Sequence, residues 1–449
     1  MIAITEEYQA NYETMTAGAQ NIREQKSCTE DISQSRPSER EISTAAPLTF
    51  IDLFAGCGGL SEGFYRMGYK ALAHVEINHW ACETLRKRMK YYGYSSKDIF
   101  HGVIEKDITS ADIIEDIDRA VQGRLVDVII GGPPCQSYST AGRVRDGKRM
   151  STDPRNFLFE SYVTILEYYR PKYFVFENVV GLLSAKVRGK LVFPLIVSAL
   201  SKFYHIESKP GLLVQNTADY GVPQVRKRVI ILGVRKDIAS RSAISLHHHL
   251  IRTHWSPDSL ELERTGKEKY ISVKEAIGDL PYVLPGEDKS TDKFDYPCDN
   301  PFLKRIGHRG EHPLHDHIAR KHNALDRERF SVMIRNRWTF GQLRQNCPQY
   351  EHERARVFDN SYVVQWWDLP SKTILAHIHK DGFQFIHPDE EQARSFTVRE
   401  AARIQSFPDD FEFMGSRGEK YKQIGNAVPP LFAEALAKAI YKYHSEVHQ

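Results

Sequence analysis

The chain has 449 residues and a formal net charge of +3, a near-balance that does not by itself indicate a nucleic-acid-binding protein. Its six cysteines are scattered without a Cys-x-x-Cys pair, which argues against a disulfide scaffold or a cysteine-based zinc site and fits a reducing compartment. Neither a membrane-spanning apolar run nor a signal peptide is visible. We therefore expect a soluble, cytoplasmic protein with no membrane partner, built from two or three domains.

Residues 1–46 are rich in Glu, Gln, Ser and Thr without a sustained period, which predicts a flexible N-terminal extension. From residue 48 onward, apolar runs typical of buried strands alternate with amphipathic stretches typical of helices. The expected strands are 48–54, 71–77, 101–104, 125–130, 173–177 and 229–234. The expected helices between them include 79–90, 157–169 and 191–203. This alternation predicts an α/β fold with a doubly wound, mostly parallel sheet.

After about residue 236 the alternation stops, and an irregular, polar stretch runs to residue 396. Thirteen of the nineteen histidines lie between residues 247 and 387, so this stretch differs in composition and predicts a second, smaller domain. Its histidines lack nearby cysteines and a recognised ligand spacing, so we expect no metal. A last helix, 429–443, should pack back onto the first domain. The predicted domains are 47–235 with 421–449, and 236–420.

Residues that carry chemistry recur where the expected strands end. Ligands of doubly wound sheets bind outside the carboxyl ends of the strands. Five such positions are Phe54–Gly59, Glu76, Asp107, Gly131–Cys135 and Glu177. This agreement predicts one common site along the carboxyl edge of the sheet.

The first of these positions is a glycine-rich turn between a strand and a helix. Its glycines lack the Gly-x-Gly-x-x-Gly spacing, so a dinucleotide, another nucleoside cofactor or a tight turn all remain open. Glu76 follows Asp52 by 24 residues and ends the second strand, where a carboxylate can accept hydrogen bonds from ribose hydroxyls. The acids around the turn suit a cationic cofactor better than a pyrophosphate.

A second turn, Gly131–Ser139, places one thiol after two glycines and two prolines. Glycine permits close approach, and proline fixes φ and removes a backbone donor, so this backbone is stiff. A buried structural cysteine needs no such setting, whereas an exposed nucleophile does. Cys135 is therefore a candidate nucleophile, and a protease, a redox enzyme and a transferase all remain open.

Several blocks occur together in a fixed order along the chain. They are Phe54–Gly59, Gly132–Gln136, Phe176–Val179, Gln224–Arg228, Arg399–Pro408 and Gly425–Pro430. In this order they resemble the DNA (cytosine-5)-methyltransferase family of bacterial restriction-modification systems, and the resemblance covers residues 48–445. It implies an S-adenosylmethionine-binding doubly wound domain and a smaller target-recognition domain, with DNA in the cleft between them.

The resemblance implies a mechanism for methyl transfer to cytosine C5. This carbon is a weak nucleophile until a thiolate adds to C6, and the resemblance assigns that thiolate to Cys135. Glu177 would hydrogen-bond N3 and the exocyclic amine, which favours the addition. Arg226 and Arg228 would lie near the target base and its phosphate, with Arg228 beside the cytosine. A water or hydroxide would then remove the C5 proton.

The same resemblance implies that S-adenosyl-L-methionine is the cofactor. Phe54 would cover the adenine, and Glu76 would hold the ribose. Backbone groups of the turn would touch the methionine part, from Ala55, Gly56, Cys57, Gly58 and Gly59. Asp107 and Ile108 would contact the adenine. The remaining cofactor-lining positions are Pro133, Leu158 and Asn426.

Double-stranded DNA is the implied partner, with the chain acting as a monomer. The basic stretch 136–155 resembles the mobile loop that closes over DNA, and its cations would help to offset the few kcal/mol that flipping a base out of the duplex costs. The expected DNA contacts are Gln136, Ser137, Arg143, Arg145 and Gln224. A cognate restriction endonuclease acting on the same site is a further partner that the resemblance suggests.

Three other classes fit parts of the sequence. An RNA (tRNA) cytosine-5-methyltransferase shares the expected fold, but the long segment between Arg228 and Thr397 favours DNA. A non-catalytic DNA-binding regulator would not need Cys135, Glu177 and the two arginines. A nicotinamide dehydrogenase would explain the glycine turn alone.

Overall fold

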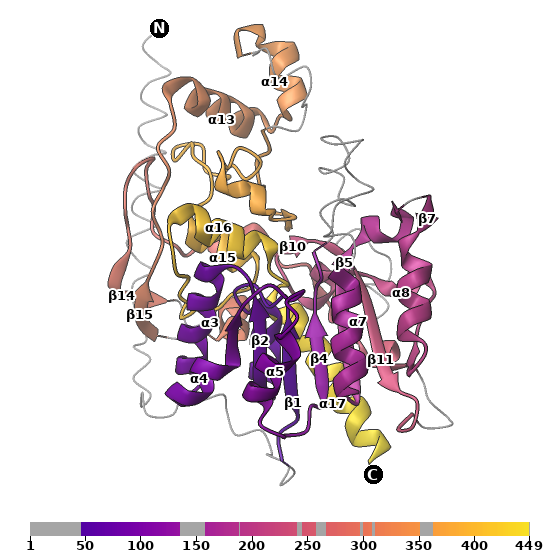
Figure 1. Ribbon diagram of the computed structural model, residues 1–449. Coiled ribbons are helices and arrows are strands. Elements are labelled where there is room, and N and C mark those ends of the chain that lie inside the picture. Colours follow the sequence, from indigo (N-terminus) through magenta and orange to yellow (C-terminus); the bar gives the residue numbers. More distant parts are fainter. Residues whose placement is uncertain are drawn as a thin grey trace, which may run out of the picture. The chain divides into compact units, whose positions relative to one another are not determined.

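The computed structural model describes residues 46–134, 158–187, 189–239, 245–256, 266–296, 300–307, 310–350 and 362–448. Ala45–Gln449 forms one compact unit (Figure 1). All of the predicted N-terminal extension except its last residue lies outside the described residues. Within the described ranges, no helix has the length and apolar character needed to cross a membrane.

A central eight-stranded sheet has the order β3-β2-β1-β4-β5-β11-β8, with β9 also paired to β11. The five strands from β3 to β5 are parallel, and β11 runs antiparallel to β5, β8 and β9. The strands are β1 (Thr49–Leu53), β2 (Lys70–Glu76), β3 (Val103–Glu105), β4 (Val128–Gly131), β5 (Tyr173–Val179), β8 (Tyr204–Ile206), β9 (Val214–Asn216) and β11 (Lys227–Arg235). The predicted doubly wound, mostly parallel α/β sheet is confirmed.

The strand order reverses between β1 and β4, which pair in parallel with Leu53 opposite Gly131. The glycine turn after β1 and the proline turn after β4 therefore leave the sheet side by side. In a doubly wound sheet such a reversal opens the crevice in which ligands bind. The topology thus places both candidate turns at the position expected of an active site.

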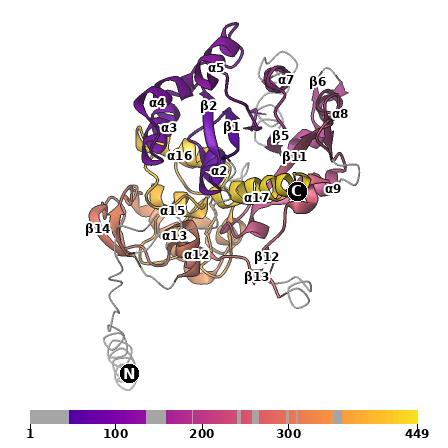
Figure 2. The same ribbon diagram turned by 90° about the horizontal axis from the view of Figure 1, so that it is seen from below.

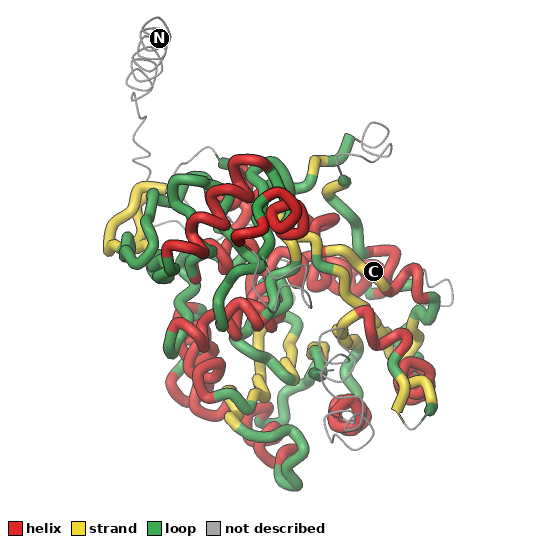
Figure 3. The backbone as a smooth tube through the Cα atoms, turned by 90° about the horizontal axis from the view of Figure 1, so that it is seen from above, coloured by secondary structure: helices red, strands yellow, loops and turns green. Residues whose placement is uncertain are grey.

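Alternate residues of the strands supply two apolar layers, one on each face of the sheet. Ile51 and Ile129 face the layer that includes α5, α7 and α8, whereas Phe50 and Ile130 face the layer that includes α2 and α17. The helices are α2 (Gly59–Arg66), α3 (His79–Tyr91), α4 (Ser96–Gly102), α5 (Ile113–Val121), α7 (Leu158–Tyr169), α8 (Val192–Leu200), α9 (Pro210–Leu213) and α17 (Pro430–Val447). Figure 3 shows the strands running between helices.

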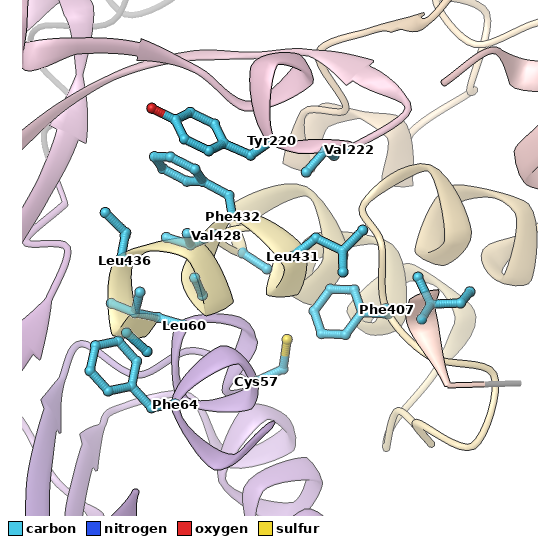
Figure 4. Packing of buried hydrophobic residues seen from close by; sticks show 14 of the residues in the cluster. Cys57, Leu60, Phe64, Tyr220, Val222, Phe407, Val428, Leu431, Phe432 and Leu436 are labelled. Carbon is cyan, nitrogen blue, oxygen red and sulfur yellow. The ribbon is translucent and has the colours of Figure 1, made fainter. Parts of the chain in front are cut away.

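Helices α2 and α17 lie side by side although they are at opposite ends of the described chain (Figure 2). Leu60 and Phe64 of α2 face Leu436 of α17 in the buried core (Figure 4). A Cβ at Gly63 would lie 2.2 Å from the backbone nitrogen of Glu434, so the two helices are in backbone contact. The prediction that the last helix packs back onto the first domain is confirmed.

The third strand differs from its predicted range of 101–104. Ser95 accepts a hydrogen bond from the Asp98 amide and caps α4, which continues to Gly102. The strand is therefore Val103–Glu105 and ends at the sheet edge. The N-cap at Ser95 overrides the weak apolar pattern of 101–104.

The segment 236–420 contains more regular structure than predicted. Its elements include α11 (Val273–Ile277), β14 (Thr291–Tyr296), α12 (Pro301–Ile306), β15 (Gly310–Leu314), α13 (Ala324–Asn336), α14 (Phe340–Asn346), β16 (Ser371–Lys372), the short helix η8 (Ala376–His379) and α15 (Val398–Ile404). The 13-residue α13 is the main correction. Among its apolar residues, only Phe330 and Met333 are buried. The helical spacing of its apolar residues was therefore too weak to predict a helix from the sequence.

Two apolar clusters divide the segment 236–420. Residues such as Phe330, Phe340 and Ile386 form a cluster of their own. Residues of α11, α12 and α15 instead join the core shared by α2 and α17. The boundaries of the two predicted domains stay a prediction, and the structure adds that part of this segment shares the main core.

Candidate active site

The glycine turn after β1 is held in a conformation that favours glycine. Gly56 and Gly58 have φ values of 56° and 89°, and Phe54 also has a positive φ of 60°. The Gly58 amide donates to the Ala55 carbonyl at 2.9 Å and closes the turn. A Cβ at Gly59 would lie 2.4 Å from the Val428 carbonyl oxygen, so only glycine fits where α2 begins.

Glu76 organises this turn from the end of β2. One carboxylate oxygen accepts the Gly56 amide at 2.8 Å, and the other accepts the Ile77 and Asn78 amides at 2.9 and 2.8 Å. A Cβ at Gly56 would meet no atom within 4 Å, so open space lies beside this carboxylate. An acid next to open space fits a ligand with hydroxyl groups or positive charge.

Asp52 is a second acid of the turn, to which the sequence assigned no role. Its side chain is buried and accepts the Ser61 hydroxyl at 2.6 Å. Burial raises the pKa of Asp52 to about 7, and the nearby Glu76 carboxylate raises it further against the Ser61 hydrogen bond. The position of Asp52 near the end of an expected strand was the sequence feature that could have marked it as a site residue.

Cys57 is not a second nucleophile. The side chain is wholly buried, and its Sγ lies 3.7 Å from the Gln423 carbonyl oxygen. Burial raises the pKa of this thiol well above its usual value. Only the backbone of Cys57 is available to a ligand.

The other predicted cofactor residues lie around the turn in different ways. The Lys106 amide donates to the Glu76 carbonyl at 3.0 Å, which brings the next residue, Asp107, beside β2. Asp107 is exposed and accepts the Thr109 amide and hydroxyl, whereas Ile108 is buried. Leu158 and Phe54 pack against the same apolar layer, and Asn426 is exposed at the end of α16 (Arg417–Asn426).

The proline turn after β4 is fixed to β5. The Asn178 side-chain amide donates to the Pro133 carbonyl at 3.1 Å in a buried hydrogen bond. A Cβ at Gly132 would lie 2.8 Å from a Glu177 carboxylate oxygen, so glycine allows this carboxylate to lie against the turn. The role of Asn178 was missed, although its block was recognised. The turn that leads into Cys135 is thereby anchored next to Glu177.

Glu177 forms an ion pair with Arg228 across strands β5 and β11. The guanidinium Nε lies 3.0 Å from the carboxylate, and the side chains are only 13% and 12% exposed. Burial lowers the pKa of Arg228, and the Glu177 carboxylate opposes this shift. The cation and the acid predicted to face the target base are therefore brought together.

Arg226 occupies a different position from its prediction beside the target base. Its side chain is buried and donates to the carbonyls of Ile374, Gly425 and Ala427 at 2.8, 3.3 and 3.1 Å. Burial lowers the pKa of Arg226 well below its usual value, and Arg228 lowers it further. Arg226 lies between β10 (Gln224–Val225) and β11, and its side chain is 2% exposed, so it does not lie on the surface.

Gln224 was predicted to contact DNA, and the structure places it in the interior instead. Its side chain is 0% exposed. Its amide nitrogen donates to Gln405 at 2.7 Å, and its oxygen accepts the Ile374 amide at 2.6 Å. These contacts leave no side-chain surface for DNA.

Five predicted residues lie outside the described residues. They are Cys135, Gln136, Ser137, Arg143 and Arg145. Their roles stay predictions.

Two of the described histidines of the segment 236–420 have structural partners. His317 lies between the Pro281 carbonyl and the Thr397 hydroxyl, and His322 contacts the Ser395 hydroxyl. Across the described ranges, no group of three or more His, Cys, Asp or Glu side chains could hold a metal ion.

Together, the doubly wound sheet, the glycine turn with its acids and the Glu177–Arg228 pair define an α/β protein with a candidate ligand site at the carboxyl edge of its sheet. Residues 48–442 match the profile of the C-5 cytosine-specific DNA methylase family. The chain belongs to this family and is a DNA (cytosine-5)-methyltransferase.

Similar proteins support the same assignment. The chain is 33% identical to the type II methyltransferase M.Bpa9945I of Bacillus paralicheniformis, over 87% of this chain and 98% of that protein. It is 34% identical to M.DdeI of Desulfomicrobium norvegicum, over 89% of this chain and 90% of that protein. Among solved structures, an E. coli protein described as a prophage-encoded DNA modification methyltransferase matches with a TM-score of 0.63 and 24% identity, over 89% and 99% of the two chains. This last likeness shows the fold.

Proposed function

We propose that this enzyme transfers a methyl group from S-adenosyl-L-methionine to C5 of a cytosine flipped out of duplex DNA, through a covalent bond between Cys135 and C6. The observation that carries the proposal is the contact of Gly132 with Glu177 beside the Glu177–Arg228 pair. It fixes the start of the Cys135 turn against the acid that would hold the base.

The proposed reaction assigns one step to each group. The Cys135 thiolate would form a bond to C6 while the C5–C6 double bond opens, and Glu177 would share a proton with N3, so that electron density moves toward C5. C5 would then take the methyl group, which leaves S-adenosylhomocysteine. A water would take the C5 proton, the Sγ–C6 bond would break to restore the thiolate, and the shared proton would return to Glu177. Arg228 orients the Glu177 carboxylate and offers a cation at the edge of the base.

The glycine turn fits S-adenosyl-L-methionine, which supplies an electrophilic methyl group when it is bound. Glu76 lies beside the open space at Gly56 and would hold the ribose. The Glu76 carboxylate beside this open space would favour a cationic ligand over a phosphate. Phe54, Asp107, Ile108, Leu158 and Asn426 would complete the site.

The type II relatives support a role in a restriction-modification system, with a cognate endonuclease as partner. The enzyme would act as a monomer in the cytoplasm, with duplex DNA held between the sheet edge and the segment 236–420. The basic stretch 136–155 would close over the DNA.

Two experiments test the proposal. Bisulfite sequencing of DNA from cells that express the chain should reveal methylated cytosines in one sequence context. Purified Cys135→Ala should then show no methylation of a duplex with that context, while binding S-adenosylhomocysteine with little change. Substantial turnover by this variant would exclude the covalent route.

A further inference from the structure

A short link, residues 424–428, separates the glycine turn from the segment 371–379, which belongs to the predicted target-recognition domain. On one side, a Cβ at Gly59 would lie 2.4 Å from the Val428 oxygen and 2.9 Å from the Ala427 Cβ. On the other side, a Cβ at Gly425 would lie 2.2 Å from the Ala376 backbone nitrogen. The link is therefore in direct contact with both segments.

Two buried side chains, Gln405 and Arg226, hold the link in place, and a third, Gln224, supports Gln405. Gln405 donates from its amide to the Ile424 and Ala427 carbonyls at 2.6 and 3.3 Å. Arg226 donates to two carbonyls of the same link. Gln224 donates to the Gln405 side-chain oxygen at 2.7 Å and so completes a continuous polar chain.

The same side chains also hold the segment 371–379. The Ile374 amide donates to Gln224, and the Ile374 carbonyl accepts from Arg226. Strand β10 pairs in parallel with β16, so Gln224 lies opposite Ser371. The single guanidinium group of Arg226 thus donates hydrogen bonds both to Ile374 and to the link.

We infer that Gln405 and Gln224, with Arg226, are positioning residues that couple the cofactor site to the DNA-recognition segment. Asn426 lies inside the link and its side chain is exposed. The carbonyls of its two neighbours, Gly425 and Ala427, accept hydrogen bonds from Arg226, which fixes the backbone on both sides of Asn426. A shift of segment 371–379 on DNA must move the link or strain these hydrogen bonds. Binding of DNA and of the cofactor should therefore favour each other.

Substitution of Gln405 tests this coupling. The inference rests on the proposed function, but the test measures binding and does not depend on catalysis. Gln405→Met removes both bonds to the link at nearly constant volume. We expect S-adenosylhomocysteine to bind about tenfold more weakly. In the wild type, we expect S-adenosylhomocysteine to bind more tightly when a duplex with the sequence context found by bisulfite sequencing is present. In Gln405→Met we expect this gain in affinity to be lost. Isothermal titration with and without that duplex measures both quantities.

Gln392→Met is the matched control. Gln392 is also buried, but it bonds Asp389, Arg394 and the Val283 amide instead of the link. We expect a similar loss of thermal stability and S-adenosylhomocysteine affinities within about twofold of the wild type. Equal losses in both variants, or unchanged coupling in Gln405→Met, would overturn the inference.

Gln405→Asn covers the case in which the Met variant does not fold. It keeps an amide but is one methylene shorter, so it cannot reach both Ile424 and Gln224. It should show the same loss of coupling in smaller degree, and full coupling would count against the inference. Failure of the proposed chemistry would appear instead in the Cys135→Ala assay, which does not depend on coupling.

Discussion

The Arg228 guanidinium lies 3.0 Å from the Glu177 carboxylate, and antiparallel pairing of β5 with β11 fixes both strands at this point. Both side chains are nearly buried, so each charge is compensated mainly by the opposite charge of its partner. The acid that would hold the cytosine is thus oriented before DNA arrives.

Glu177→Gln should reduce methylation severely, because an amide cannot hold the proton that activates the ring. We expect a loss of about 100-fold or more in the single-turnover rate. Transfer of labelled methyl groups to duplex DNA measures it. S-adenosylhomocysteine affinity should stay within about twofold, and a near-normal rate would remove the assigned role.

Gly59→Ala should destabilise the protein and weaken cofactor binding together, because the added Cβ meets the Val428 oxygen at 2.4 Å. Overpacking of this kind costs about 1–3 kcal/mol. Urea unfolding and S-adenosylhomocysteine titration measure the two effects. Gly211→Ala is the control, since a Cβ there meets no atom within 4 Å; it should leave S-adenosylhomocysteine affinity unchanged and raise stability by no more than about 1 kcal/mol.

Asp52 should make stability depend on pH in a defined direction. Its pKa is raised by burial to about 7 from 3.8, so its contribution to stability is full below about pH 4 and is lost as the pH rises through 7. Asp52→Asn cannot ionise, so its stability relative to the wild type should increase between pH 5 and 8 and then level off. Urea unfolding of both proteins across this range measures the difference. A constant difference would show that Asp52 does not titrate there.

Arg403→Met should be strongly destabilising. Arg403 and Asp409 are 0% exposed and 2.7 Å apart, and Arg403 also pairs with Asp279. Removing one partner of a buried ion pair costs about 3–5 kcal/mol. Urea unfolding should show this loss. Arg335→Met removes an ion pair whose arginine is 65% exposed and solvent-screened, and it should change stability little.

Much of the fold followed from local sequence pattern. Continuous apolar runs marked the buried parallel strands, and the residues directly after them marked the site, because the strands share one carboxyl edge. Glu76 was therefore found at the end of β2, and Glu177 lies two residues before the end of β5. The weakly amphipathic α13 and the capped start of α4 gave no comparable signal.

The inward positions of Gln224 and Arg226 could not be read from the sequence. Their partners lie far along the chain, with Ile374 148 residues and Gly425 199 residues beyond Arg226. A polar side chain in an extended segment looks the same in sequence whether it faces DNA or a buried carbonyl. Only the tertiary fold decides between the two.

Contacts between the link and the segment 371–379 are made largely to backbone atoms. Gln224 and Arg226 bond the amide and carbonyl of Ile374, and Gly425 approaches backbone atoms of Leu375 and Ala376. These backbone contacts do not involve the exposed side chain of Leu375, whereas Ile378 is buried in the shared core. A substitution of Leu375 would therefore leave the backbone contacts to the link intact, so the exposed surface of the segment can vary while the link keeps its position.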